Sequence, residues 1–402
     1  MNRPISTLSG TTQGNSDSIS KTPLIDRAVA ARKMKVLHVG KFYPPHMGGI
    51  ETHLQTLCGE LRKSVDLQVV VSNDHDVTAE EDLNGVKVTR VATGMTLAST
   101  PLCPGMIAKL RGSESDIIHL HFPNPMAVFA YMASQHKGRL VVTYHSDMVR
   151  QKFLGAMFTP FLHAVLRRSS AIIATSPNYV ESSSVLAQYR GKCEVIPLGI
   201  PLQDFDNGDP ARVAALRQQY GDRLIVSVGR LVYYKGFEYL IRAMTHVQGR
   251  LLIVGEGPLS ARLNALAAEL GVADRVTFLG KIDHQSLVAC YHAARVFALA
   301  SVARSEAFGI SQVEAMAAGL PVVNTRLDSG VPYVSLHDQT GLTVPPDDAE
   351  ALAHAINRLL NNEDMRLRFG AAARLRAHQE FSVDVMVART LSLYDKVMLR
   401  PD

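Results

Sequence analysis

The sequence predicts an α/β fold of two doubly wound parallel sheets, in two Rossmann-like domains that face one another across a cleft. Short apolar segments alternate with longer amphipathic ones from Met34 onward, and this alternation stops at residues 195–210 before it begins again. The chain has 402 residues, of which 47% are hydrophobic, so it is long enough to bury two cores of domain size.

The first half of the chain has six candidate strands with helices between them. Strands are expected at residues 35–39, 67–72, 86–91, 117–120, 140–143 and 171–174, with helical segments at 51–61 and 152–168. Residues 1–33 precede this pattern and are rich in Ser, Thr, Gly and Asn up to about Ser20. Because they contain too little apolar surface to offset the loss of chain entropy, we predict a mostly disordered tail there.

The second half begins after "VIPLGIPLQDFDNGDP", residues 195–210, where prolines, glycines and aspartates gather as in a domain linker. Its candidate strands lie at residues 224–228, 251–254, 276–278, 296–300, 321–324 and 342–344. In doubly wound sheets, ligands bind outside the carboxyl ends of the strands. The loops that follow the strands are therefore the candidate site.

Composition narrows the class of partner. The 42 Lys and Arg against 37 Asp and Glu give a formal charge of +5, which fits an anionic substrate or a membrane surface better than dedicated nucleic-acid binding. The four cysteines lie far apart without a CxxC pair, so they indicate neither a zinc site nor a disulfide framework. No apolar run is long enough for a spanning helix and no signal-peptide pattern is present. We expect a cytoplasmic protein.

The loop after the first strand reads "GKFYPPHMGGIETH", with Gly48 and Gly49 directly before a helix. Backbone amides can approach a phosphate closely where there is no side chain, and the amino end of a helix favours negative charge. A tight strand-to-helix turn explains the same residues, and the stretch does not match GxGxxG.

Two loops of the second half carry comparable signals. "GRLVYYKGFEYL" starts with Gly229 and brings Arg230 and Lys235 to the end of a strand, where two cations could neutralise a diphosphate as it leaves. A solvated basic loop is the alternative. The next strand ends in "GEGP", where Glu256 and Gly257 form another loop of close backbone approach.

The stretch "RSEAFGISQVEAMAAGLPVV", residues 304–323, holds two carboxylates around a helix start. We predict a loop with Glu306 and Phe308, then a helix over residues 310–318 with Glu314 in its first turns. The amides of residues Gly309, Ile310 and Ser311 would form an anion seat between the two carboxylates. One acidic group could then hold sugar hydroxyls and the other a ribose, which points to a nucleotide sugar.

Together, "HMGGIETH", "GRLVYYKG", "GEGP", "SEAFGISQVEAMAAGLPVV" with its E-x7-E spacing and "TGLTVPP" resemble the retaining family 4 glycosyltransferases of GT-B fold, from about Met34 to the carboxyl end. The resemblance implies that Glu306 contacts the transferred sugar and Glu314 the ribose. It implies that Arg230 and Lys235 hold the donor diphosphate, which Gly49 approaches from the other domain. The family's amino-domain histidine matches His145 in "VVTYHSD".

The resemblance also implies an activity. It would be retaining transfer of a hexose-type sugar from a UDP- or GDP-sugar to a glycan or a polyprenyl- or lipid-linked acceptor, in the biosynthesis of cell-surface polysaccharide and without a metal or another cofactor. The acceptor domain would be residues 34–199, completed by a returning helix at about 383–402, and the donor domain residues 200–382. A nucleotide-sugar isomerase and a non-catalytic nucleotide-sugar sensor are the alternatives, although a sensor needs no leaving-group stabilisation.

Two kinds of sequence motif could indicate a metal site instead of a metal-free reaction. "DHD" at residues 74–76 and "DFD" at 204–206 spell DxD, a metal–diphosphate signature, but the basic pair already serves a diphosphate and we favour structural loops. His119 and His121 point to one face of a strand end, where a metal pair, a cleft wall or plain packing could explain them. No third ligand lies nearby in the sequence, so we favour wall or packing.

Two further segments bear on specificity and location. The helical segment 152–168 has an apolar stripe with basic ends, which suits either core packing or docking on anionic lipid at the inner membrane; a wide stripe is more often core. The loop "LDSGVPYVSLHDQTG" has Ser329–Gly330 with no following acid, where many members of the family carry Gly-Gly and then Glu.

Overall fold

The computed structural model describes residues 32–46, 48–97, 100–147 and 152–400. The predicted tail of residues 1–33 therefore lies almost wholly outside the described residues. Both sheets belong to one compact unit, Met34–Asp402. No helix in the described ranges combines the length and apolar character needed to span a bilayer.

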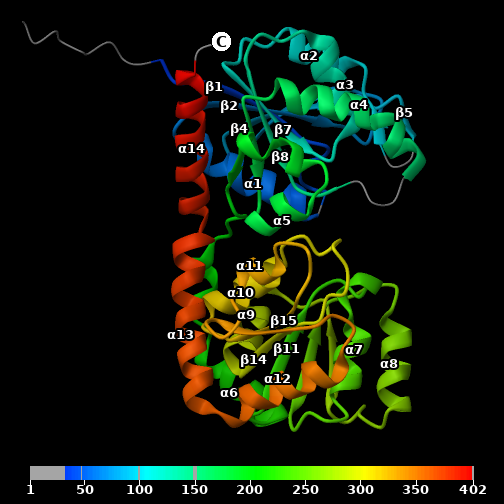
Figure 1. Cartoon of the computed structure of the whole chain (residues 1–402), viewed down its shortest axis with the longest axis vertical. Helices are drawn as coiled ribbons and strands as arrows, with labels where there is room; N and C mark the ends of the chain where they lie inside the picture. Colours follow the sequence, from blue (N-terminus) through cyan, green and yellow to red (C-terminus); the bar gives the residue numbers. More distant parts are fainter. Residues whose placement is uncertain (1–31, 47, 98–99, 148–151, 401–402) are drawn as a thin grey trace, which may run out of the picture. The chain divides into compact units, whose positions relative to one another are not determined.

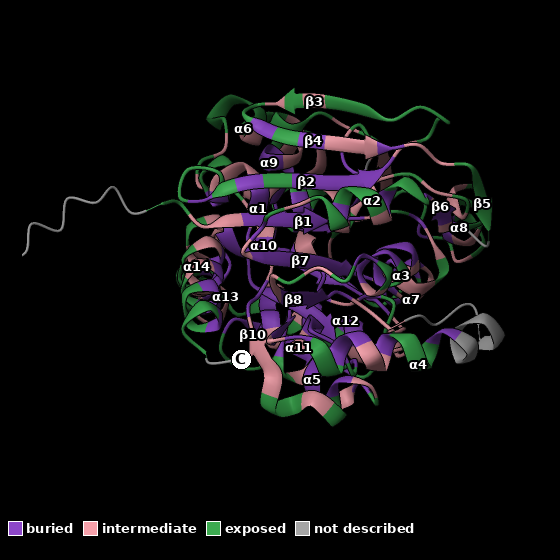
Figure 2. Cartoon of the chain, turned by 90° about the horizontal axis from the view of Figure 1, so that it is seen from above, coloured by how far each residue is buried: buried purple, intermediate pink, exposed green. Residues whose placement is uncertain are grey.

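The first sheet has eight strands in the order β10-β9-β8-β7-β1-β2-β4-β3. The strands are β1 (Lys35–Val39), β2 (Asp66–Ser72), β3 (Ala79–Leu83), β4 (Val86–Val91), β7 (Ile117–Phe122), β8 (Arg139–Tyr144), β9 (Ala171–Ala174) and β10 (Cys193–Val195). Every neighbouring pair is parallel except β3 and β4. Figure 2 shows the central strands β1, β7 and β8 buried and the edge strand β3 exposed.

Helices and a small hairpin surround this sheet. They are α1 (Gly49–Leu61), α2 (Gly105–Arg111), α3 (Pro125–Ser134), α4 (Lys152–Arg168), α5 (Pro177–Ser182), the 3₁₀ segment η1 (Leu186–Lys192) and the paired strands β5 (Met95–Leu97) and β6 (Thr100–Leu102). Asn124 and Ser176 begin α3 and α5 by accepting a hydrogen bond from the backbone of the first turn, and a proline follows each of them.

The second sheet is parallel throughout, in the order β13-β12-β11-β14-β15-β16. Its strands are β11 (Leu224–Val228), β12 (Arg250–Val254), β13 (Val276–Gly280), β14 (Val296–Leu299), β15 (Val322–Thr325) and β16 (Gly341–Val344). In chain order this is 3-2-1-4-5-6, the order of a doubly wound dinucleotide-binding sheet. The strand order reverses between β11 and β14, which marks the place where a ligand is expected.

The helices of the second half flank both faces of that sheet. They are η2 (Leu202–Phe205), α6 (Pro210–Tyr220), η3 (Tyr233–Lys235), α7 (Phe237–Ala243), α8 (Ser260–Glu269), α9 (His284–Ala293), α10 (Ile310–Ala317), α11 (Val331–Val334), α12 (Ala349–Asn361) and α13 (Glu363–Glu380). The strands between them consist of near-continuous apolar residues and are mostly buried, as expected for a parallel sheet covered on two faces, except that the edge strand β13 is only partly buried.

The last helix, α14 (Val383–Leu399), packs against the first sheet's helix α1. Met386, Leu393, Tyr394 and Val397 are buried in the same apolar cluster as Leu54 of α1. In Figure 1, α14 lies beside the first sheet.

The predicted fold class, two doubly wound sheets, is confirmed. The expectation of purely parallel sheets is wrong at one edge, because β3 pairs antiparallel with β4, and the β5–β6 hairpin was not anticipated. Helix α4 has the predicted bounds. Phe158, Leu162 and Val165 on it are buried, which favours core packing for the described side chains of residues 158–168.

Candidate functional site

A buried ion pair stands where the second sheet reverses its strand order. Lys235 follows β11 and Glu306 follows β14, and the Lys235 ammonium lies 2.5 Å from Glu306 Oε2. The two side chains are only 13% and 9% exposed. Ser301 Oγ donates a second hydrogen bond to the same carboxylate oxygen, at 3.1 Å. The loops after β11 and β14 are thus fastened together by charge.

Tight backbone packing holds the Lys235 side chain against the end of β11. A Cβ on Gly229 would lie 3.2 Å from Lys235 Cε and 3.3 Å from its Nζ, so any side chain there pushes against the lysine. The backbone of Gly229 also lies close to that of Gly255 in the loop after β12. A Cβ on Gly255 would come within 2.2 Å of the Gly229 oxygen. The absence of a side chain at Gly229 leaves room for the Lys235 ammonium in its pair with Glu306.

Helix α10 begins at Ile310, as predicted, and Gly309 is its N-cap. Gly309 has φ 75°, a left-handed conformation that residues with a Cβ rarely adopt, and it offers no side chain as a cap. The first amides of a helix have no partner within that helix. Ser311 Oγ is also buried without a hydrogen-bond partner among the described residues. The first amides of α10 and the Ser311 hydroxyl are therefore candidate donors to an anion.

The second carboxylate, Glu314, lies on the partly buried face of α10. Tyr291 of α9 is buried and its hydroxyl donates to Glu314 Oε2 at 2.6 Å. Burial raises the pKa of the Glu314 carboxyl, and the bond from Tyr291 acts in the opposite direction. The same burial, next to Glu314, raises the pKa of Tyr291 well above its usual range. A ligand hydroxyl that donated to Glu314 would therefore meet a poorly solvated acceptor.

The remaining predicted residues of this half are placed differently. Arg230 is exposed, and its guanidinium has no ion pair within the described part of the chain. Glu256 is exposed as well, whereas a Cβ on Gly257 would clash with the Leu231 backbone. Phe308 has its ring in the apolar core, packed edge-on to Phe381, and its carbonyl oxygen accepts from Gln312. A donor contact through the Phe308 ring is therefore not supported.

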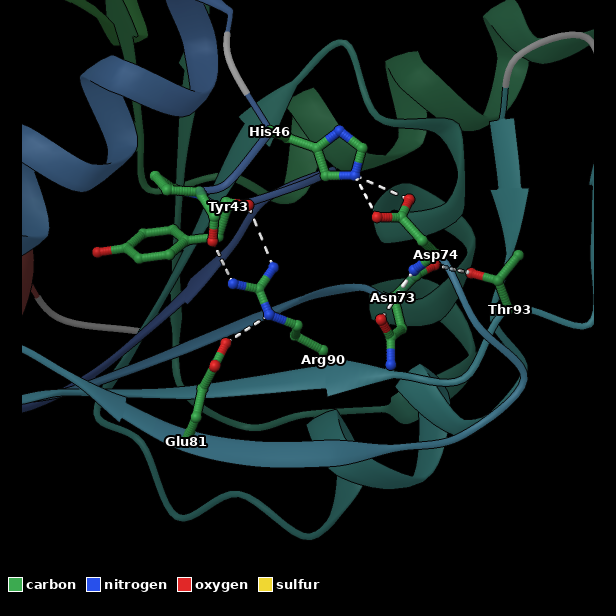
Figure 3. Close-up of polar contacts among 8 residues, drawn as sticks. Tyr43, His46, Asn73, Asp74, Glu81, Arg90 and Thr93 are labelled. Atoms are coloured by element: carbon green, nitrogen blue, oxygen red, sulfur yellow. Dashed lines mark hydrogen bonds and ion pairs between the residues drawn. The ribbon is translucent and has the colours of Figure 1, made fainter.

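In the first half, the loop that carries Gly48 and Gly49 is fastened by Arg90 of β4 (Figure 3). Arg90 donates to the carbonyls of Tyr43 and Pro44 and pairs with Glu81. Gly48 is the N-cap of α1, and a Cβ on Gly49 would meet nothing within 4 Å. A side chain at Gly49 would therefore find open space, whereas a Cβ on Gly48 would lie 2.3 Å from Glu51 Oε2.

The DxD stretches make contacts within the protein. His46 Nε2 lies 2.6 and 2.8 Å from the two oxygens of Asp74, which is also drawn in Figure 3. Asp206 accepts from His378 at 2.8 Å and from Arg374 at 3.1 Å. These contacts support the interpretation of both stretches as structural loops.

His145 does not stand alone. It belongs to a buried cluster, hereafter the histidine cluster, which consists of His38, His53, His119, His121 and His145. His145 Nε2 lies 3.2 Å from His121 Nδ1, and the two rings stack with centroids 5.5 Å apart. His119 and His121, expected as cleft wall or packing, have partners that the sequence placed far from them.

A chain of hydrogen bonds runs through this cluster. From His121 Nε2 it continues to His38 Nδ1 at 3.0 Å, and from His38 Nε2 to the hydroxyl of Tyr394 on α14 at 3.1 Å. Tyr394 then meets His119 Nδ1 at 2.6 Å, and His119 Nε2 meets Thr143 Oγ1 at 2.6 Å. Burial lowers the pKa of His38 to about 3, so its ring is neutral at pH 7.

The predicted residues therefore form separate groups. Lys235, Glu306, Gly229 and the start of α10 come together around the second sheet, while His145 and the Gly48–Gly49 turn belong to the first. Ser301 and Tyr291, which hold the two carboxylates, were missed. A serine at a strand end and a tyrosine in an amphipathic helix carry no motif, so only the fold shows their partners.

Two family models match the chain in sequence order. "Glycosyltransferase Family 4" matches residues 47–204, and "Glycosyl transferases group 1" matches residues 212–376. The first match covers the strands and helices of the first sheet from α1 onward, and the second covers the loops with Lys235, Glu306 and Glu314.

Curated relatives match almost the whole chain. "O-antigen chain mannosyltransferase C" of Escherichia coli is 32% identical over 369 residues, which cover 91% of this chain and 99% of that protein. "D-rhamnosyltransferase WbpZ" of Pseudomonas aeruginosa is 33% identical over 353 residues, with 87% and 92% covered.

A solved structure agrees with the fold. Anabaena Alr3699/HepE in complex with UDP has a TM-score of 0.74 at 21% identity and covers 90% of this chain and 100% of its own. Because two family models match in order and relatives above 30% identity match nearly end to end, this protein belongs to glycosyltransferase family 4 and is a glycosyltransferase of GT-B fold.

Proposed function

We propose that the protein transfers a mannose-type hexose from a nucleoside-diphosphate sugar to a glycan or lipid-linked acceptor, with retention of configuration and without a metal. The observation that carries this proposal is the Lys235–Glu306 pair beside the unsatisfied donors of α10. The two curated relatives are named for transfer of mannose and of rhamnose, its 6-deoxy form, which supports the sugar class.

The diphosphate is the leaving group, and its charge grows as the bond to the sugar breaks. Lys235, Arg230 and the amides of Gly309 to Ser311 stabilise that charge, together with the Ser311 hydroxyl. Arg230 is free to reach the phosphates because it is exposed and has no ion pair among the described residues. These donors replace the divalent cation that other glycosyl transfers use.

The two carboxylates recognise the two sugars of the donor. Glu306, held by Lys235 and Ser301, accepts hydrogen bonds from hydroxyls of the transferred hexose. Glu314 accepts from the ribose hydroxyls, and Tyr291 keeps its carboxylate in place. Both acceptors are poorly solvated, so a donor that lacks these hydroxyls leaves an unsatisfied buried group and binds more weakly.

The acceptor hydroxyl attacks the face that the diphosphate leaves. The bond between the anomeric carbon and the phosphate oxygen breaks with its electron pair on the diphosphate. A new bond then forms to the acceptor oxygen, whose proton passes to the departing phosphate. Neutral His145, whose pKa burial holds well below its usual range, orients the sugar through its ring or backbone.

The acceptor is a polysaccharide chain or its lipid-linked precursor, as the name of the O-antigen relative suggests. We place the reaction at the cytoplasmic face of the inner membrane. Helix α4 buries one face, but Phe161 on it is 40% exposed and packs edge-on to Phe129, which is 41% exposed. This aromatic pair would give a peripheral contact with lipid. Liposome flotation of the wild type and of a Phe161→Ser variant tests that contact.

One experiment tests the activity. The purified protein, in excess chelator, is incubated with GDP- and UDP-hexoses with and without an oligosaccharide acceptor. We expect diphosphate release that depends on the acceptor, a product with the donor's anomeric configuration by proton NMR, and no glycosylated protein by intact mass. An inverted product or a covalent adduct contradicts the mechanism. Epimerised donor without acceptor indicates an isomerase, and binding without turnover a sensor.

A further inference from the structure

We propose that His53, His121 and His145 form a three-histidine site for a divalent transition-metal ion of the Zn²⁺ class. His53 comes from α1, His121 from β7 and His145 from the end of β8. One ring nitrogen of each lies within 4.8 Å of the other two, and all three residues are buried. The carboxyl ends of adjacent parallel strands and the helix beside them thus meet at one point.

The spacing suits a tetrahedral ion. With Zn–N bonds of about 2.0–2.1 Å, two ligand nitrogens stand about 3.3 Å apart. His121 Nδ1 and His145 Nε2 are 3.2 Å apart, so this edge is already formed. The His53 ring lies edge-on to His145, with centroids 5.0 Å apart, and 5.8 Å from the His121 ring. Only the third ligand has to move inward.

His53 is free to make that movement. It is 8% exposed, yet neither ring nitrogen has a hydrogen-bond partner within the described part of the chain. Buried polar groups in native proteins are nearly always paired, and an orphan often indicates an ion or a ligand. Since the ring makes no hydrogen bond, it turns toward an ion without breaking one. A packing role alone would suit an apolar side chain better.

The hydrogen-bond chain through the cluster provides the support that a ligating imidazole needs. A metal-bound histidine almost always donates its second N–H to a fixed acceptor. His121 Nε2 can donate to His38, which donates to Tyr394, and the chain continues to His119 and Thr143. In this orientation His38 and His119 each give one hydrogen bond and accept one. With the proton of His145 on Nδ1, both His121 Nδ1 and His145 Nε2 offer a lone pair to the ion.

The donor set selects the kind of metal. Three imidazoles without a carboxylate suit Zn²⁺, Cu²⁺ or Ni²⁺, whereas Mg²⁺, Ca²⁺ and Mn²⁺ prefer oxygen. The site is therefore distinct in chemistry from a metal–diphosphate centre.

Occupancy has a consequence that depends on the proposed function. An ion on His145 Nε2 takes the ring that orients the donor sugar, so Zn²⁺ inhibits transfer. His145 then either orients the donor sugar or binds the ion, and it cannot do both at once. Binding of the ion itself does not depend on that role.

The test is metal binding by the full chain after removal of metal with a chelator. Co²⁺, a spectroscopic substitute for Zn²⁺, should give the visible absorption of a tetrahedral site at one equivalent, and Zn²⁺ should displace it. His53→Leu keeps a similar volume and breaks no hydrogen bond, so it should fold. We expect it to weaken binding by about 100-fold or more. His354→Ala, which removes an exposed histidine of α12, is the control and should bind as the wild type does.

No tetrahedral Co²⁺ spectrum, or a spectrum unchanged in His53→Leu, overturns the proposal. In the transfer assay, Zn²⁺ should inhibit the wild type at concentrations that leave His53→Leu active. If Zn²⁺ binds through His53 without inhibiting, the metal site stands and the role given to His145 is wrong.

Discussion

Removing Lys235 should damage stability and catalysis at once. Its ammonium lies 2.5 Å from Glu306 in a pair whose side chains are 13% and 9% exposed. Lys235→Ala leaves a buried carboxylate with Ser301 as its remaining neighbour. Breaking a buried pair in this way costs about 3–5 kcal/mol of folding free energy. If the ammonium also stabilises the departing diphosphate, turnover falls by ~10²–10³.

Arg230→Ala is the matched control, because Arg230 sits in the same loop but is exposed and has no ion pair within the described ranges. It should change the free energy of unfolding by less than about 0.5 kcal/mol. Its turnover should nevertheless fall on the scale of Lys235→Ala. Urea unfolding and steady-state kinetics on the two variants separate the two effects.

A double variant tests whether the stability loss comes from the uncompensated charge. Glu306→Gln removes that charge, so Lys235→Met combined with Glu306→Gln should regain most of the lost stability while remaining inactive. Equal unfolding midpoints for Lys235→Ala and Arg230→Ala would refute the buried pair. Near-normal turnover in both single variants would refute the leaving-group assignment.

Three further outcomes follow. Burial raises the pKa of Glu314 above its value in the unfolded chain, so the stability that this carboxyl contributes is present at low pH and is lost as pH rises through the folded pKa. The Glu314→Gln variant should therefore have a higher melting temperature than the wild type at pH 7, by a margin that shrinks toward pH 4.5. By calorimetry it should also bind nucleoside diphosphate less tightly. Arg90→Ala frees two loop carbonyls and should raise KM for the donor more than it lowers kcat, unless the Gly48–Gly49 turn has no role in binding. Tyr394→Phe leaves two buried histidine nitrogens unpaired and should cost about 1–3 kcal/mol in urea, with no loss if the chain of bonds is absent in solution.

Apolar runs made most of the fold predictable. Strands such as β1, β9 and β11 have the expected bounds because each is a short buried segment between polar loops. Strand β3 was missed because "AEEDL" is acidic and exposed; it exists by pairing with β4 across a tight turn. The residues of β3 themselves do not indicate a strand, and only the adjacent β4 does.

The candidate site was predictable only in part. The rule that ligands meet the ends of parallel strands located Lys235, Glu306 and the start of α10. It could not show that Lys235 and Glu306 pair with each other, because that depends on side-chain direction. The histidine cluster is assembled from four separate segments, so no spacing in the sequence could have indicated His38 or His53 as partners of His145.

The position of α14 has a consequence for how the protein is made. Tyr394 and Val397, near the end of the chain, are buried against α1 and the first strands. The segments of the first sheet leave the ribosome long before α14 is synthesised. The α1 side of the first sheet therefore stays uncovered while the whole second sheet is synthesised. A nascent chain that stops short of Val383 keeps that apolar surface open to chaperones and proteases. The α1 side of the first sheet is therefore covered only after α14 has been synthesised.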